Sequence, residues 1–175
     1  MKAMIKSAVK LMLSPSGRID RKSFLIGFAG FVFFGVMVNF LMGRVEKQGA
    51  LEFWLGVFAI FLFFQMTYAV YGKRLHDIGR SFWPLTSCIV VTILILIAGM
   101  MFYGGSEYFS EFAQYDRKDT IDPARRDAIT QAYELRLKDS EKTLGPIISA
   151  LWLGFTLWLG VAKSDPEANR YGEPF

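Results

Sequence analysis

The sequence predicts an all-α integral membrane protein in which four spanning helices form a bundle. Apolar residues make up 53% of the 175-residue chain, more than the 45–50% of an ordinary soluble domain. Charged residues are segregated from them along the chain, which leaves four apolar windows: Ser23–Gly43, Leu51–Gly72, Phe82–Gly104 and Leu144–Ala162. Each window is long enough for the ~20-residue helix that crosses ~30 Å of hydrocarbon. This composition excludes a soluble enzyme, a disulfide scaffold and a disordered chain.

The distribution of basic residues predicts the orientation. The side that holds the first segment, the connection between the second and third windows, and the last segment carries 11 Lys and Arg against five Asp and Glu. The opposite side carries nine basic residues against 11 acidic ones. Because Lys and Arg in short loops remain in the cytoplasm, we expect both termini to be cytoplasmic.

Residues 1–16 precede the membrane domain, which we assign to residues 17–175. Lys2, Lys6 and Lys10 recur every four residues and leave apolar side chains for the other faces, which predicts an amphipathic helix on the cytoplasmic leaflet. The alternative is a solvated tail. No small-residue cleavage site follows, so the pattern does not indicate a signal peptide.

The longest polar segment, residues 105–143, separates the third and fourth windows and is predicted to be a periplasmic insertion. Its first part is aromatic and acidic. Asp122-Pro123 is typical of a helix start, and good helix formers continue over Ala124–Lys142 until Gly145-Pro146. We expect a helix over the mouth of the bundle, and the alternative is a solvated hairpin.

Three polar side chains inside the windows, Gln65, Ser87 and Thr156, fall at similar depths from the cytoplasmic surface. They form a predicted intramembrane polar layer, either as hydrogen bonds between helices or as a path for a solute. No ionisable residue lies at the centre of any window. This argues against a proton-coupled transporter or an ion pump.

Three short motifs lie at the cytoplasmic ends of the windows: GRIDRKSF from Gly17, KRLHDIGRSFW from Lys73, and NRYGEP from Asn169. The predicted topology places all three on one side, so they can meet. The candidate site residues taken from them are Arg18, Arg21, Arg74, His76, Asp77, Arg80, Ser81, Trp83, Asn169, Tyr171 and Gly172.

Two interpretations of these residues remain open. The first is a hydrogen-bonded clasp in which Arg18, Arg74 and Asn169 gather around Asp77. The second is a basic seat for an anionic group such as a lipid phosphate, held by arginine forks. Catalysis is disfavoured, because no nucleophile motif and no metal-ligand spacing accompanies His76. We predict no cofactor and no metal site.

The three motifs together resemble the family catalogued as domain of unknown function 805, the YhaH-like bacterial inner-membrane proteins. The resemblance extends over most of the chain, and the arginine-leucine-histidine-aspartate run at Arg74 is its most specific part. It implies a small multi-pass protein of the bacterial inner membrane with uncharacterised biochemistry. Leu25 and Phe82 depart from the residue types usual in the family, and the long segment 105–143 is larger than its typical connection.

The predicted function is binding of an anionic lipid headgroup or a partner protein at the basic cytoplasmic face. A small channel or transporter component is the alternative, and a headgroup enzyme that uses His76 is a third. The expected partners are membrane lipids, with a homo-oligomer or another membrane protein as further candidates. Nucleic acid is not expected.

Overall fold

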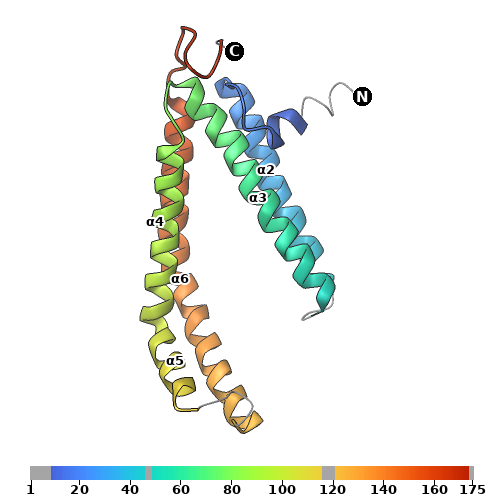
Figure 1. Ribbon diagram of the computed structural model, residues 1–175, viewed down its shortest axis with the longest axis vertical. Helices are drawn as coiled ribbons and strands as arrows, with labels where there is room; N and C mark the ends of the chain where they lie inside the picture. Colours follow the sequence, from blue (N-terminus) through green and yellow to red (C-terminus); the bar gives the residue numbers. More distant parts are fainter. Residues whose placement is uncertain (1–8, 46–48, 116–120, 174–175) are drawn as a thin grey trace. The chain divides into compact units, whose positions relative to one another are not determined.

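The computed structural model describes residues 9–45, 49–115 and 121–173. Within these ranges the chain is helical and contains no strand, apart from an isolated bridge between Asn169 and Gly172. The helices are α2 (Arg21–Met42), α3 (Ala50–Asp77), α4 (Trp83–Met100), α5 (Ser106–Ala113) and α6 (Pro123–Val161), and a kink at Tyr103 and Gly104, whose backbone angles are not helical, separates α4 from α5 (Figure 1).

Four helices are long and apolar enough to cross a membrane: α2, α3, α4 with its continuation to Ala113, and α6. Each predicted window falls on one of them, which confirms an all-helical protein with four candidate spans. Residues 9–13 are helical, while the rest of the predicted amphipathic helix, residues 1–8, lies outside the described residues. The side of the membrane that holds the segment 105–143 stays a prediction.

The chain divides into two compact units. The first contains Met1–Thr86 and Thr156–Phe175, and the second contains Ser87–Phe155. Each unit is described by itself below.

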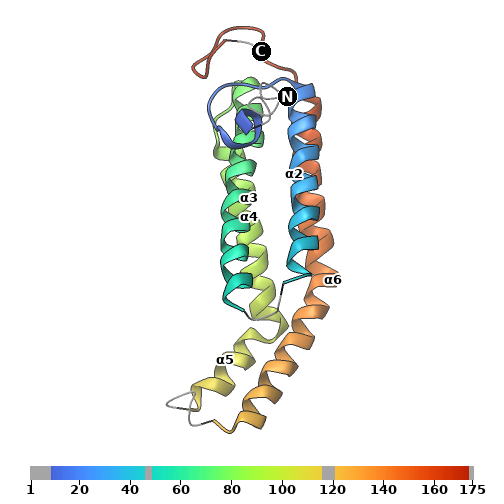
Figure 2. The same cartoon turned by 90° about the vertical axis from the view of Figure 1, so that its right-hand side faces the viewer.

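In the first unit, α2 packs against α3 (Figure 2). Gly27 allows the close approach, because a Cβ there would lie 3.1 Å from both methyl groups of Val70. The rings of Phe31 and Phe63 meet at 4.3 Å, and Phe24 meets Tyr71 edge-on at 5.5 Å. Aromatic contacts of this kind and close packing supply the helix association that the hydrophobic effect cannot supply inside lipid.

The end of α3 is fixed by a Schellman motif at Gly79, which has φ +71°. The Gly79 N–H donates to the His76 carbonyl at 3.1 Å, and the Arg80 N–H donates to the Leu75 carbonyl at 2.8 Å. These two bonds satisfy carbonyl groups that the last helical turn would leave unpaired. The motif that begins at Lys73, which the sequence places in the connection between two apolar windows, is therefore mostly helical. Only five residues, 78–82, connect α3 to α4.

In the second unit, α4 and α6 lie against each other. Leu144 covers Gly99, and the Trp152 Nε1–H donates to the Thr92 Oγ1 at 3.0 Å. The 39 residues of α6 rise about 58 Å, more than the ~30 Å of hydrocarbon, and the helix that begins at Trp83 bends at Tyr103 and Gly104 before it continues as α5 to Ala113. The polar first part of α6 exceeds the length that a span needs, and α5 faces it through the ion pairs of Glu107 with Arg136 and of Glu111 with Arg125.

The predicted stop at Gly145-Pro146 is wrong, because α6 continues through Pro146 to Val161. Continuation costs the one backbone hydrogen bond that proline cannot donate. A break would instead leave about four unpaired N–H groups at the start of a new helix beside the hydrocarbon. The continuous helix is therefore the less costly arrangement.

We predict that Gly79→Ala destabilises the protein by about 1–2 kcal/mol, because alanine is strained at positive φ. Gly145→Ala is the matched control: Gly145 lies inside α6 with no atom within 4 Å of an added Cβ, so alanine there stabilises the helix by up to about 1 kcal/mol. Unfolding midpoints in detergent measure both. Equal midpoints for the two variants would contradict the assignment of the motif.

Candidate functional site

The charged centre of the first unit is the pair Arg74 and Asp77 in the last turn of α3. Both are fully buried. The Arg74 Nη1 donates to the Asp77 Oδ2 and, at 3.0 Å, to the Ser164 hydroxyl. Its Nε and Nη2 donate to the carbonyls of Leu159 at 2.9 Å and Ala162 at 2.6 Å. Arg74 thus caps the C-terminus of α6 from a different helix.

Arg18 completes the charged centre from the segment that precedes Asp20, the N-cap of α2. Its Nε donates to the Asp77 Oδ1 at 3.4 Å, and its Nη2 donates to the Asp77 carbonyl at 3.3 Å. Further bonds join Nη2 to the Asp165 carbonyl, and Nη1 to the carbonyls of Glu167 at 2.7 Å and Gly172 at 3.2 Å. All five N–H groups of the guanidinium therefore have an acceptor. We call Arg18, Arg74 and Asp77 the clasp.

The segment 165–172, which we call the strap, follows α6 and lies over the clasp. Its first residue, Asp165, donates its N–H to the Asp77 carbonyl at 2.8 Å. The Asn169 side-chain amide donates to the His76 carbonyl and to the Asp165 Oδ2, both at 3.1 Å. This amide and the Glu167 N–H hold the pKa of Asp165 below its ordinary value. The carboxylate of Asp165 is therefore ionised at neutral pH and fixes the turn of the strap.

His76 lies between the strap and the connection to α4. Its ring stacks on Tyr171 with 3.8 Å between centroids and an angle of 5°, and it meets Phe82 edge-on at 4.5 Å. The Nδ1 lies 3.3 Å from the Gly17 carbonyl, which only accepts, so Nδ1 carries a proton. The Nε2 is buried and has no hydrogen-bond partner among the described residues.

The clasp offsets the cost of burying three charges in two ways. Each charge makes hydrogen bonds to the others or to backbone carbonyls, which is the condition under which a buried ion pair is tolerated. In addition, the positive surplus lies at the C-terminus of α6, where the helix dipole favours a cation. Removing one partner would leave a charge without this compensation.

Other candidate residues stand at the edge of this arrangement. Arg21 is exposed, and its Nε donates to the Ala162 carbonyl at 3.0 Å. Arg80 is exposed, Ser81 is half-buried, and Trp83 is 74% exposed at the first residue of α4. The structure therefore gathers the three motifs at one end of the first unit and separates them into a buried clasp and an exposed margin.

The residues of the predicted polar layer have separate partners. The Gln65 Nε2 donates to the Leu13 carbonyl at 2.6 Å, and the Thr156 hydroxyl bonds with that of Tyr71 at 2.8 Å. Ser87 is exposed and belongs to the second unit. Each of the two bonds joins segments far apart in the sequence.

Sequence reasoning missed Lys73, which is 3% exposed. Its ammonium donates to the carbonyls of Lys10 at 3.0 Å and Leu11 at 2.6 Å, so it caps the helical turn before the first span. The sequence alone does not mark this residue, because Lys73 stands in a motif with two other basic residues, Arg74 and Arg80. Among the described residues, no three His, Cys, Asp or Glu side chains gather as a metal site would require.

A comparison with protein families finds one match, to the family described as Protein of unknown function (DUF805), over residues 12–114. The matched segment contains the first two motifs and α2 to α5. The strap and α6 lie outside it. No curated protein and no solved structure matches the chain.

We predict that Asp77→Asn destabilises the protein by about 3–5 kcal/mol, because it leaves two buried arginines without their counter-charge. Asp139→Asn is a matched control, since Asp139 also pairs with a basic residue three positions away, Lys142, but both side chains are at least 68% exposed. Its expected cost is about 0–0.5 kcal/mol. Thermal unfolding in detergent distinguishes the two, and similar midpoints would contradict a stabilising role for the clasp.

Proposed function

The chain belongs to the DUF805 family, and we propose that it binds anionic lipid headgroups at exposed basic side chains around the clasp. The role is one of binding rather than catalysis. The observation that carries the proposal is the division of the basic residues at this end of the first unit into two groups, one buried and bonded, the other exposed.

The buried basic side chains, Arg18 and Arg74, are not available to bind a ligand. Every N–H group of Arg18 has an acceptor within the protein, and four bonds hold Arg74. A phosphate would have to displace these acceptors. We therefore assign the clasp a structural role and the ligand site to the exposed basic side chains.

The exposed group forms what we call the basic margin, and its members are Arg21, Lys22, Arg80, Lys163 and Arg170. They stand at or next to the ends of α2, α3 and α6, or in the strap. Lysine and arginine beside an anionic membrane surface each contribute about 1 kcal/mol of attraction. The exposed indole of Trp83 suits the same depth, since tryptophan concentrates at membrane interfaces.

We propose that this end of the protein lies on the cytoplasmic side of a bacterial inner membrane. The excess of basic over acidic residues in the three motif segments supports this orientation.

In a Cys88→Ala background, we expect Lys163→Cys to react with an impermeant thiol reagent only from the cytoplasm, and Lys138→Cys only from outside. Both lysines are exposed, so a failure to react from either side would not follow from burial. The opposite labelling pattern would contradict the orientation.

The lipid proposal is tested with native mass spectrometry of the full chain in detergent, with phosphatidylglycerol or phosphatidylcholine added. We expect preferential retention of phosphatidylglycerol by the natural chain. The triple variant Lys22→Ala, Arg80→Ala, Lys163→Ala removes three charges of the margin that make no bond to the clasp. At about 1 kcal/mol per charge, its affinity for phosphatidylglycerol should fall by at least about tenfold.

The control removes the same number of positive charges from the polar part of α6: Arg126→Ala, Lys138→Ala and Lys142→Ala. It should retain phosphatidylglycerol as the natural chain does. If both triple variants lost phosphatidylglycerol equally, the effect would depend on net charge alone, and the proposal would be overturned. Unchanged retention in the margin variant would overturn it as well and favour a protein partner at this surface.

A further inference from the structure

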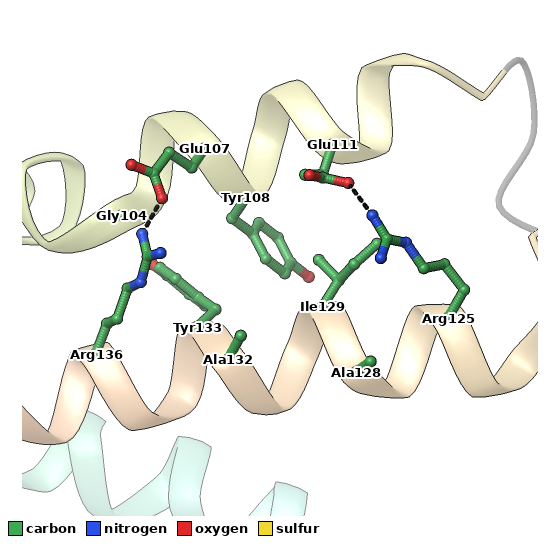
Figure 3. Close-up of a pocket in the computed structure, with 10 residues that line it drawn as sticks. All are labelled: Gly104, Glu107, Tyr108, Glu111, Arg125, Ala128, Ile129, Ala132, Tyr133 and Arg136. Atoms are coloured by element: carbon green, nitrogen blue, oxygen red, sulfur yellow. Dashed lines mark hydrogen bonds and ion pairs between the residues drawn. The ribbon is translucent and has the colours of Figure 1, made fainter.

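The second unit contains a hollow of about 210 Å³ between α5 and the first part of α6. Figure 3 shows its construction. The hollow exists because the side chains of Ala128 and Ala132, one helical turn apart on α6, are short. The Tyr108 side chain points toward them from α5. The Tyr108 ring stacks with that of Tyr133, with 4.6 Å between centroids and an angle of 29°. The hollow therefore has a small, apolar floor and an aromatic wall.

Two ion pairs flank the aromatic wall. Glu107 pairs with Arg136 on one side of Tyr108, and Glu111 pairs with Arg125 on the other, with 3.0 Å between the Glu111 Oε2 and the Arg125 Nη2 (Figure 3). The four side chains are between 38% and 66% exposed. Ion pairs this exposed contribute little to stability, so ligand groups of either charge can replace one partner at low cost.

The charge balance of the hollow indicates the class of ligand. Two guanidinium groups and two carboxylates line it, so their formal charges cancel, and a ligand with net charge of either sign gains from one pair of groups and is opposed by the other. A zwitterion satisfies both: its carboxylate takes a bidentate position on an arginine, and its ammonium faces a glutamate beside an aromatic ring.

The size of the hollow limits the ligand further. A cavity of roughly 150 Å³ holds one benzene ring, so about 210 Å³ accommodates a ring with a short chain. The position also matters, because Glu107 to Arg136 lie beyond the apolar windows that end at Gly104 and resume at Leu144. The ligand therefore arrives from water.

We propose that the hollow between α5 and α6 is a binding site for a small zwitterion with an apolar or aromatic body, of the class of a free amino acid. The site is independent of the basic margin, since every residue used here belongs to the second unit. Its α6 wall also lies outside the segment matched by the family.

Equilibrium dialysis of radiolabelled L-phenylalanine against the full chain in detergent tests the proposal. Unlabelled phenethylamine and 3-phenylpropionate each retain the ring and one charge. We expect saturable binding of L-phenylalanine, with each single-charge analogue competing at least about tenfold less well. Absence of saturable binding would overturn the site. Equal competition by either analogue would overturn the zwitterion class.

Two variants and a control localise the binding. Ala132→Leu fills the hollow at an exposed helical position where leucine is well tolerated, and it should abolish binding while the unfolding midpoint is unchanged. Arg125→Gln should weaken binding by about tenfold. Arg126→Gln changes the neighbouring residue, which does not line the hollow, and should bind as the natural chain does. Binding that survives Ala132→Leu in a folded protein would contradict this location.

Discussion

The carboxylate of Asp77 holds the first unit together because it balances two arginines that come from different parts of the chain. Arg74 belongs to the same helix turn, whereas Arg18 precedes α2. Once Asp77 fixes both guanidinium groups, their remaining N–H groups reach the last turn of α6 and the strap. One side chain therefore determines where three helix ends and the strap meet.

This arrangement changes how the charge of the protein should be read. The basic surplus counted along the sequence includes residues whose charged groups are buried and bonded within the protein, namely Arg18, Lys73 and Arg74. Only the remaining Lys and Arg side chains present their charge at the surface. A count of Lys and Arg by segment is a basis for predicting orientation, because insertion depends on the charges of the unfolded loops. It indicates binding sites poorly, because the count contains no information about burial.

The sequence predicted the spans because each depends on a local property, a run of apolar residues of sufficient length. It also predicted that the three motifs can meet, as they do in the first unit. It did not predict that α3 continues to Asp77 or that α6 passes through Pro146, because helix ends depend on caps that other segments supply. The Arg74 bonds to Leu159 and Ala162 are an example. The hollow between α5 and α6 could not be predicted from the sequence either, since it depends on how two helices pair across the segment 105–143.

The strap is the last of the clasp's partners to be synthesised. Ribosomes synthesise α2 and α3 well before residues 165–172, so Arg18, Arg74 and Asp77 are present before the carbonyls of the strap to which Arg18 donates. Until then, water must hydrate the Arg18 N–H groups that later donate to these carbonyls. The strap can cover the clasp only after it has been synthesised, so a nascent chain stopped before Asp165 would leave N–H groups of Arg18 exposed that the finished protein buries.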